Sequence, residues 1–268
     1  MRSTKIVIML ALIVSASFAN AQIKNETKST WKVQAIKGNF GAHADHFSNM
    51  NLGFMEGRIN DASYKGVSTE GLTPEDFVYN TSGGNINLGV MLSRTPITTT
   101  IGKYETLELS VGAHFGREVM IDYYNNNPAD FCGTNNVVSC YNDITFCDLQ
   151  NEVSISATYR RGVSLANIIN IYTGLGTSLG TTMGSKMWIF ANEYNANTEQ
   201  INAVSESYSL EESVLGRIYV PIGGELVIMN KLRFTAEGRL GVGYNHSFSQ
   251  GGAGNLNYSV LGGLAWNI

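Results

Sequence analysis

The fold is decided by the last 39 residues, Asn230–Ile268, where 232–245 read LRFTAEGRLGVGYN and 256–268 read LNYSVLGGLAWNI. In both segments apolar residues alternate with charged residues, asparagine, serine and glycine. Period-2 alternation of this kind predicts two β-strands, each with one apolar and one polar face. Both strands are longer than the roughly 5–6 residues usual in soluble sheets. The pattern therefore favours strands that cross a membrane.

The start of the chain has the features of an export signal. Basic residues precede an apolar run, Ile6–Val14, and Ala19-Asn20-Ala21 forms a small-residue cleavage site. The apolar run is about half the length that a spanning helix needs, which disfavours a membrane anchor. We expect a signal peptide at 1–21 and one outer-membrane β-barrel domain at 22–268, in which 22–37 is a periplasmic lead-in.

The composition supports long strands and argues against a nucleic-acid partner. Charged residues make up 15% of the chain, whereas about 25% is usual, and proline occurs only four times. The net charge is −4 and no basic patch is present, so we expect no nucleic-acid partner. We also expect no cofactor.

Period-2 alternation recurs along the chain, and we predict eight strands. They are 49–60, 83–94, 104–118, 150–161, 167–183, 212–225, 230–246 and 256–268. The first strand could begin as early as Gly38, because Phe40, Ala42 and Ala44 also alternate. A separate spanning strand at 31–42 is rejected, because nine strands would place the C-terminus outside the cell and mix long with short connections.

The connections alternate between long and short, which sets the orientation. The long ones are 61–82, 119–149 and 184–211. Outer-membrane barrels have short periplasmic turns and longer extracellular loops. We therefore expect these three loops to lie outside the cell and both ends of the barrel domain to lie in the periplasm.

Alternation alone does not distinguish a membrane barrel from a soluble, lipocalin-like barrel with an apolar pocket. The polar face is rich in glycine and small polar residues, which fit the narrow interior of an eight-stranded barrel. Aromatic residues lie toward strand ends, as in the girdles at the two membrane interfaces. The chain also ends on a strand whose apolar face carries Tyr258, Leu264, Trp266 and Ile268. The apolar face is therefore predicted to contact lipid.

The export signal, the eight segments and stretches such as VPIGGELVIMNKLRFTAEGRLGVGYN (220–245) resemble the small outer-membrane β-barrels of Gram-negative bacteria, such as the OmpA transmembrane region and OmpX. This resemblance implies an all-β fold, a transmembrane antiparallel up-and-down barrel with long extracellular loops. It further implies contact with outer-membrane lipid and lipopolysaccharide, and recognition of the last strand by the barrel-assembly machinery. The family usually ends on an aromatic residue, whereas this chain ends on Ile268.

A non-catalytic role in envelope structure or surface interaction, exerted through the extracellular loops, fits this class best, although the sequence does not identify the extracellular partner. Charged residues in phase with the polar face are candidates for the lumen: Glu108, Glu152, Arg160, Arg217, Arg233, Glu237 and Arg239, with His114 nearby. Charges in a narrow lumen must be paired, since each unpaired one costs several kcal/mol. They form either a permanent plug or the gate of a narrow diffusion pore.

Three cysteines, Cys132, Cys140 and Cys147, fall in the segment 119–149. In an exported protein they predict one disulfide and one remaining thiol, and three pairings are possible. The C-x7-C-x6-C spacing is not a zinc spacing. The same segment is acidic and has no Lys or Arg, which allows either solvated loops or divalent cations bridging to lipid phosphates.

One motif suggests an enzyme. The residues HFSN at 46–49 resemble the His-x-Ser-Asn element of outer-membrane lipid A deacylases. That resemblance implies His46 as base and Ser48 as nucleophile, and Glu56 would be the nearest acid to orient the histidine. The predicted strand 49–60 places the motif near the periplasmic side, whereas the deacylases carry theirs at the outer leaflet.

Overall fold

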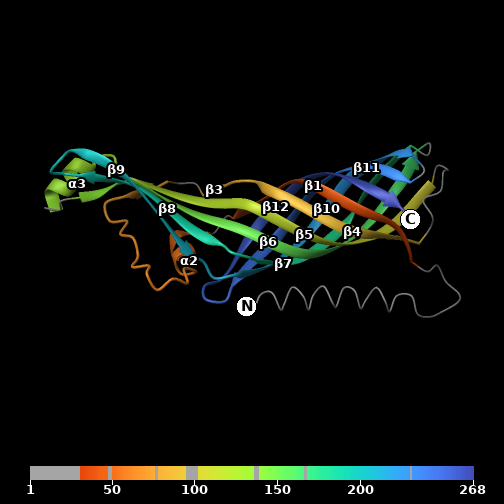
Figure 1. The fold of residues 1–268 in the computed structure, drawn as a ribbon, viewed down its shortest axis with the longest axis horizontal. Coiled ribbons are helices and arrows are strands. Elements are labelled where there is room, and N and C mark those ends of the chain that lie inside the picture. The colour runs from red at the N-terminus through yellow and green to blue at the C-terminus, as the bar shows by residue number, and fades with distance from the viewer. Residues whose placement is uncertain are drawn as a thin grey trace.

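The computed structural model describes residues 31–268 except 48–49, 76–77, 95–101, 136–138, 166–167 and 230, so the predicted signal peptide lies outside the described residues. Antiparallel strands form a closed barrel, shown in Figure 1. They are β1 (Lys32–Phe47), β4 (Gly83–Ser93), β5 (Gly102–Tyr124), β6 (Ser139–Leu165), β7 (Ile169–Thr182), β10 (Ser213–Met229), β11 (Leu232–Ser247) and β12 (Gly251–Asn267). No helix in the described part of the chain is long and apolar enough to cross a membrane.

Pairing of the first and last strands closes the ring. β1 runs antiparallel to β12 from Ala35 opposite Asn267 to Phe47 opposite Asn255, and its other edge pairs with β4. The remaining ring pairs join β5 to β4 and β6, β7 to β6 and β10, and β11 to β10 and β12. The predicted eight-stranded up-and-down barrel is confirmed.

The prediction for the first strand was wrong. β1 covers Lys32–Phe47, so it includes most of the rejected strand at 31–42 and the end of the predicted lead-in. The segment 49–60 instead contains the short helix α2 (Leu52–Glu56), which buries Met55. β1 replaces the predicted first strand, and the count remains eight. The alternation at Phe40, Ala42 and Ala44 belongs to β1.

The apolar residues of the barrel point outward. Leu240 and Val260 are 67% and 71% exposed, although both are large and apolar. Aromatic side chains flank this apolar band, with Trp266 near the periplasmic end and Tyr244 and Phe248 near the other. On the terminal strand, the four predicted outward residues are all exposed: Tyr258, Leu264, Trp266 and Ile268. Such an exterior suits lipid.

The barrel interior is polar and charged, so the lipocalin-like alternative was wrong. A soluble ligand-binding barrel would turn its apolar face inward. Here the large side chains that are fully buried in the ring include Lys37, Arg160 and Arg233.

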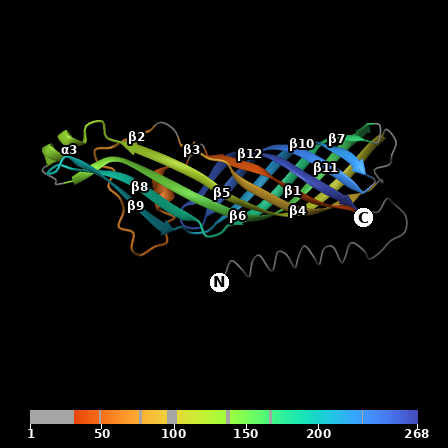
Figure 2. The ribbon, with the colours of Figure 1, turned by 45° about the horizontal axis from the view of Figure 1, so that its top comes forward.

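Two strands continue far beyond the barrel. β5 has 23 residues and β6 has 27, and their outer halves form a sheet with the hairpin of β8 (Lys186–Asn195) and β9 (Gln200–Ser209). Figures 1 and 2 show this extension tapering away from the barrel toward α3 (Pro128–Asn135), at the end opposite the C-terminus. Two short strands, β2 (Thr73–Pro74) and β3 (Tyr79–Asn80), pair with the outer part of β5.

The predicted loops 119–149 and 184–211 are therefore largely strands, which corrects the expectation of long loops there. The extension has its own apolar core, which includes Val119, Ile121, Ile144 and Phe146. Met55 of α2 packs into the same core. These segments are ordered as a sheet because their inward faces are apolar, although their overall composition is acidic.

A β-bulge marks the point where β5 leaves the barrel. The pairing of β5 with β6 shifts between His114 and Arg117, and Gly116 has a φ of +71°. The left-handed backbone region favours glycine, which has no Cβ to clash. A bulge bends its strand and increases the local twist. It allows β5 to turn from the ring into the extension just where β4 begins at Gly83.

Candidate functional site

Two clusters of ion pairs fill the barrel lumen. The upper cluster, nearer the extracellular end, consists of Asp45, Arg117, Glu152 and Arg217 with two histidines. Arg217 donates hydrogen bonds to Asp45 at 2.8 and 3.2 Å and to Glu152 at 2.6 and 2.7 Å. Arg117 pairs with the same two carboxylates, and its distance to Glu152 is 3.3 Å. Two carboxylates are thus neutralised by two guanidinium groups.

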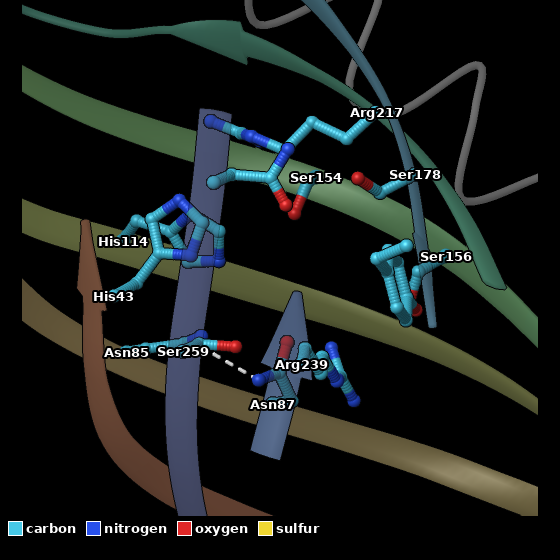
Figure 3. A pocket seen from close by; sticks show the side chains of 12 residues that line it. His43, Asn85, Asn87, His114, Ser154, Ser156, Ser178, Arg217, Arg239 and Ser259 are labelled. Carbon is cyan, nitrogen blue, oxygen red and sulfur yellow. Dashed lines mark hydrogen bonds between the residues drawn. The ribbon is translucent and has the colours of Figure 1, made fainter. Parts of the chain in front are cut away.

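The two histidines of the upper cluster stack on each other. The ring centroids of His43 and His114 are 4.3 Å apart. His43 lies 3.3 Å from Asp45, and His114 lies 3.3 Å from Glu152. Figure 3 shows the stacked rings beside Arg217. The stacked pair therefore links β1, which carries His43 and Asp45, to β5 and β6, which carry His114 and Glu152.

The lower cluster lies nearer the periplasmic end and centres on Glu108 and Glu237. Arg160 bridges them, with a hydrogen bond of 2.6 Å to Glu237 and an ion pair to Glu108. Lys37 lies 3.3 Å from Glu108 and 3.6 Å from Glu237. Arg239 donates to Glu237 at 2.6 Å. Five charged groups from four different strands, β1, β5, β6 and β11, therefore meet inside the barrel.

One further ion pair lies beyond each cluster, toward the corresponding end of the barrel. Arg233 donates to Glu225 at 2.5 Å near the periplasmic turn. Arg58, which follows α2, binds Asp148 at 2.5 Å and covers the mouth of the barrel. All four side chains are nearly inaccessible to solvent.

Between the two main clusters lies a small polar cavity of about 20 Å³, which is lined by serine, asparagine and histidine side chains among others. A cavity needs about 10–15 Å³ to hold one water molecule. The space seen in Figure 3 thus has room for about one water. Side chains therefore fill the lumen at this level, which is the arrangement of a plug.

The structure places all seven charged residues predicted for the lumen inside the barrel, and His114 with them. It brings them into three groups, since Arg233 is paired separately with Glu225. The hydroxyl of Tyr172 also donates to Glu237, at 2.7 Å. Sequence reasoning missed several residues of the network: Lys37, His43, Asp45, Arg58, Arg117, Tyr172 and Glu225. Lys37, His43 and Asp45 alternate in phase with each other on β1. They were missed because the first strand was placed too late.

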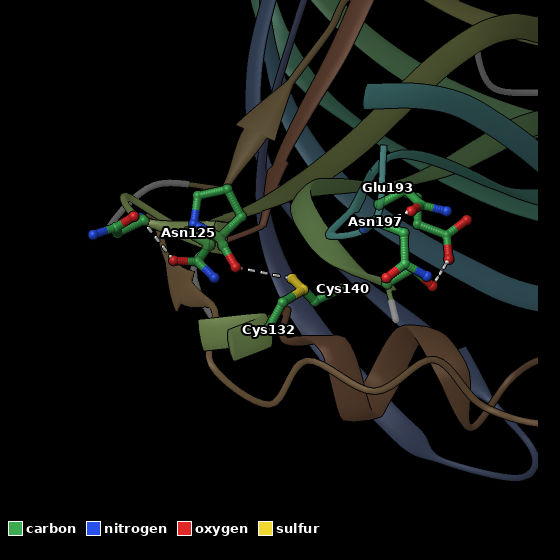
Figure 4. Close-up of a disulfide and its surroundings, with 9 residues drawn as sticks. Asn125, Cys132, Cys140, Glu193 and Asn197 are labelled. Atoms are coloured by element: carbon green, nitrogen blue, oxygen red, sulfur yellow. Dashed lines mark hydrogen bonds between the residues drawn. A yellow bond between two sulfur atoms is a disulfide. The ribbon is translucent and has the colours of Figure 1, made fainter. Parts of the chain in front are cut away.

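The structure of the extension shows which two of the three cysteines form the disulfide. Cys132 of α3 and Cys140 of β6 form a disulfide at its tip, shown in Figure 4. Cys147 has a free thiol and lies buried in β6. Burial, and then the charge of Glu118, raises the pKa of the Cys147 thiol to about 12. This thiol is therefore protonated and unreactive at neutral pH.

His46 and Phe47, the first half of the HFSN motif, are the last two residues of β1 and lie at the end of the barrel next to the extension, so the predicted position at the start of the first strand was wrong. His46 is exposed, and its Nδ1 lies 3.2 Å from the side-chain amide of Asn80. Ser48 lies outside the described residues. Glu56 accepts a hydrogen bond from the hydroxyl of Tyr64. The interaction that the structure gives His46 is thus with an amide, while Glu56 is bound to a tyrosine.

The extracellular extension offers an acidic surface with an accessible edge. Over the segments 51–82, 118–149 and 183–212, Asp and Glu far outnumber the only cations, Arg58, Lys65 and Lys186. Among the described residues, β9 is paired along its length with β8 alone, and nearly all of its side chains are exposed. In the described part of the chain, no group of three or more His, Cys, Asp or Glu side chains is placed so that it could hold a metal ion.

Comparison with known proteins finds solved structures of low similarity to this chain. No protein-family model and no curated protein sequence matches the chain. Neisserial surface protein A is 10% identical, with a TM-score of 0.38 over 89% of this chain and 99% of that one. OprG from Pseudomonas aeruginosa is 9% identical, with a TM-score of 0.33 over 88% and 97%. Ail, the attachment invasion locus protein of Yersinia pestis, is 8% identical, with a TM-score of 0.30 over 88% and 97%.

The closed ring of antiparallel strands, its apolar exterior and its paired interior define the class. The chain is a small transmembrane β-barrel with the architecture of the OmpA- and OmpX-type proteins.

Proposed function

We propose that this protein is a non-catalytic outer-membrane anchor that presents a rigid acidic sheet outside the cell for surface interaction. The observation that carries the proposal is the continuation of β5 and β6 from a plugged barrel into an extension with its own apolar core. A flexible loop loses conformational entropy when it binds, whereas a preformed sheet has already lost it. The extension is therefore built to keep a binding surface in place.

The charge of the extension defines the chemistry of the partner. Its exposed hairpin carries Glu193, Glu199 and Glu206 against Lys186. An acidic surface attracts basic surfaces and raises their association rate, with a strong dependence on salt. We propose a basic extracellular partner, whose encounter with the cell is steered by this field.

Binding of a cationic polypeptide to vesicles that carry the folded protein tests this role. Combined Glu193→Gln, Glu199→Gln and Glu206→Gln substitutions should weaken binding, most strongly at low salt. Lys65→Gln with Lys186→Gln changes charge in the opposite direction and should strengthen it. Equal binding by all three proteins would contradict the proposed role of the extension.

Three measurements separate this function from its alternatives. In planar bilayers, the plugged lumen should give no stable conductance steps, whereas a diffusion pore would give them. Lipid A incubated with the purified protein should keep its mass, whereas a deacylase would release acyl chains, and a Ser48→Ala variant would not. Fractionation should place the protein in the outer membrane, with gel mobility that changes on boiling.

A further inference from the structure

A groove runs over the lipid-facing wall of the barrel near its periplasmic end. It is formed by β5, β6, β7 and β10 and has a volume of about 1090 Å³. Its floor includes Val163, Ile171 and Ile222, which are 41%, 52% and 65% exposed. Val163 and Ile171 are direct cross-strand neighbours, and Ile222 lies opposite Thr173 on the next pair of strands. The apolar floor is thus continuous across three strands.

Cations gather along this groove. Arg94, Lys103 and Arg161 line it, and Glu105 is the one carboxylate among the described lining residues. Lys103 lies directly opposite Val163, one of the floor residues. The side chain of Arg161 is 70% exposed, and its Nε lies 3.3 Å from Glu105. Because Glu105 offsets only one of the three positive charges, the groove keeps an excess of positive charge.

The position of these cations near the periplasmic rim indicates that the ligand is a phospholipid. Lys103 is the second residue of β5 and Arg161 lies four residues before the end of β6, so both are near the periplasmic rim. At this depth a phospholipid carries its phosphate, and its acyl chains extend toward the bilayer centre. A single Lys or Arg side chain near a membrane surface extends its charged end to the headgroup region and does not by itself bind one particular lipid. Three of them beside a continuous apolar floor match both parts of one lipid molecule.

We propose that this groove binds one anionic phospholipid of the periplasmic leaflet. Lys103, Arg161 and Arg94 hold the anionic headgroup at the rim, and an acyl chain passes over Val163 and Ile171 toward Ile222, which lies seven residues from the periplasmic end of β10. The lipid remains with the protein as a bound molecule that does not exchange freely with the bilayer. This site is independent of the extracellular surface and of the plugged lumen.

Native mass spectrometry of the full chain in detergent tests the site, with phosphatidylglycerol and phosphatidylcholine as probes. The wild type should retain one phosphatidylglycerol in preference to phosphatidylcholine. Each Lys or Arg near an anionic lipid contributes about 1 kcal/mol, or roughly a fivefold change in affinity. Lys103→Gln with Arg161→Gln should therefore lower the affinity for phosphatidylglycerol by roughly 30-fold and leave that for phosphatidylcholine little changed.

Lys186→Gln with Lys231→Gln is the matched control, because it removes the same charge from exposed positions outside the groove. This control should bind phosphatidylglycerol as the wild type does, and heat-modifiable gel mobility should show that all three proteins are folded. Equal retention of the two lipids by the wild type, or equal affinity for phosphatidylglycerol in both double variants, would overturn the proposal.

Discussion

The barrel and the extracellular extension have opposite interiors, although β6 runs through both. On one continuous face of β6, Ile144 and Phe146 are buried in the apolar core of the extension. Further along the same face, Glu152 and Arg160 are buried in the lumen. Asp148 lies at the boundary and pairs with Arg58. The surrounding solvent explains the difference: lipid requires an apolar exterior, while water allows the apolar residues to turn inward.

The largest expected effect comes from removing a lumen cation. Arg217→Met should destabilise the barrel by about 3–5 kcal/mol, because Asp45 and Glu152 then lose a main partner while they remain buried. Urea unfolding in liposomes measures the change. Lys186→Met, on an exposed part of the extension, should change stability by at most about 0.5 kcal/mol. Similar losses in both variants would show that the lumen pairs are not important for stability.

A substitution with an effect of similar magnitude should show that the extension can unfold while the barrel stays folded. Phe146→Ala removes a fully buried ring and should cost the extension about 3–5 kcal/mol. Proteolysis should then cut the extension, while the protected barrel fragment keeps its heat-modifiable mobility. Phe190→Ala, at a half-exposed position of β8, should leave proteolysis nearly unchanged. Loss of the barrel together with the extension would mean that the two regions fold as one unit.

The exteriors of the two regions should respond differently to the same charge. Leu240→Arg places a cation against lipid near the bilayer midplane and should cost about 2–4 kcal/mol. Ile201→Arg on β9 is also at an exposed apolar residue, but in water, and should cost at most about 0.5 kcal/mol. Urea titrations of both variants give the two values. A harmless Leu240→Arg would place that face in water.

The disulfide should have a smaller effect that stays local. Cys132 and Cys140 are eight residues apart. A disulfide that closes so short a loop lowers the conformational entropy of the unfolded chain and stabilises the folded extension by about 2 kcal/mol. Cys132→Ser with Cys140→Ser should speed proteolysis near α3, at the tip of the extension. The unfolding midpoint of the barrel should not move, and a shift in that midpoint would contradict a local role.

The smallest effect concerns the free thiol. Cys147 is buried and its thiol pKa is raised to about 12, so at pH 8 it carries almost no thiolate. A maleimide should therefore label the folded protein very slowly and the urea-unfolded protein rapidly. Cys147 lies on the other face of β6 from Phe146 and outside the apolar core, so Phe146→Ala should accelerate labelling only where it unfolds the extension. Rapid labelling of the folded wild type would contradict the packing of the extension.

The barrel strands of the C-terminal half, β7, β10, β11 and β12, could be predicted to within a few residues, except at the ends of β10 and β12. Their apolar residues alternate without interruption, as in the segment around Leu240 and Val242. The extension was missed for two physical reasons. The bulge at Gly116 shifts the phase of β5, and the outer segments are acidic, so they were read as loops. The start of β1 was predicted wrongly because 49–60 was counted as the first strand, so that a separate strand at 31–42 would have made nine.

The lumen could be predicted as a set of charges but not as a network. Period 2 shows that Glu108 and Arg160 point inward, yet their meeting depends on the register between β5 and β6. Arg58 lies outside every spanning strand, so alternation gives no sign of its pairing with Asp148. The cysteine pairing likewise depends on the turn made by α3.

Spin-label accessibility along β11 and β9 in liposomes tests most directly which face meets lipid. In a Cys147→Ser background, single cysteines replace Leu240, Val242, Ile201 and Val204, and each carries a nitroxide. Labels at 240 and 242 should be relaxed by oxygen, which concentrates in the bilayer, and labels at 201 and 204 by a water-soluble nickel complex. Nickel accessibility at 240 and 242 would contradict a lipid-facing apolar exterior and a polar plugged lumen.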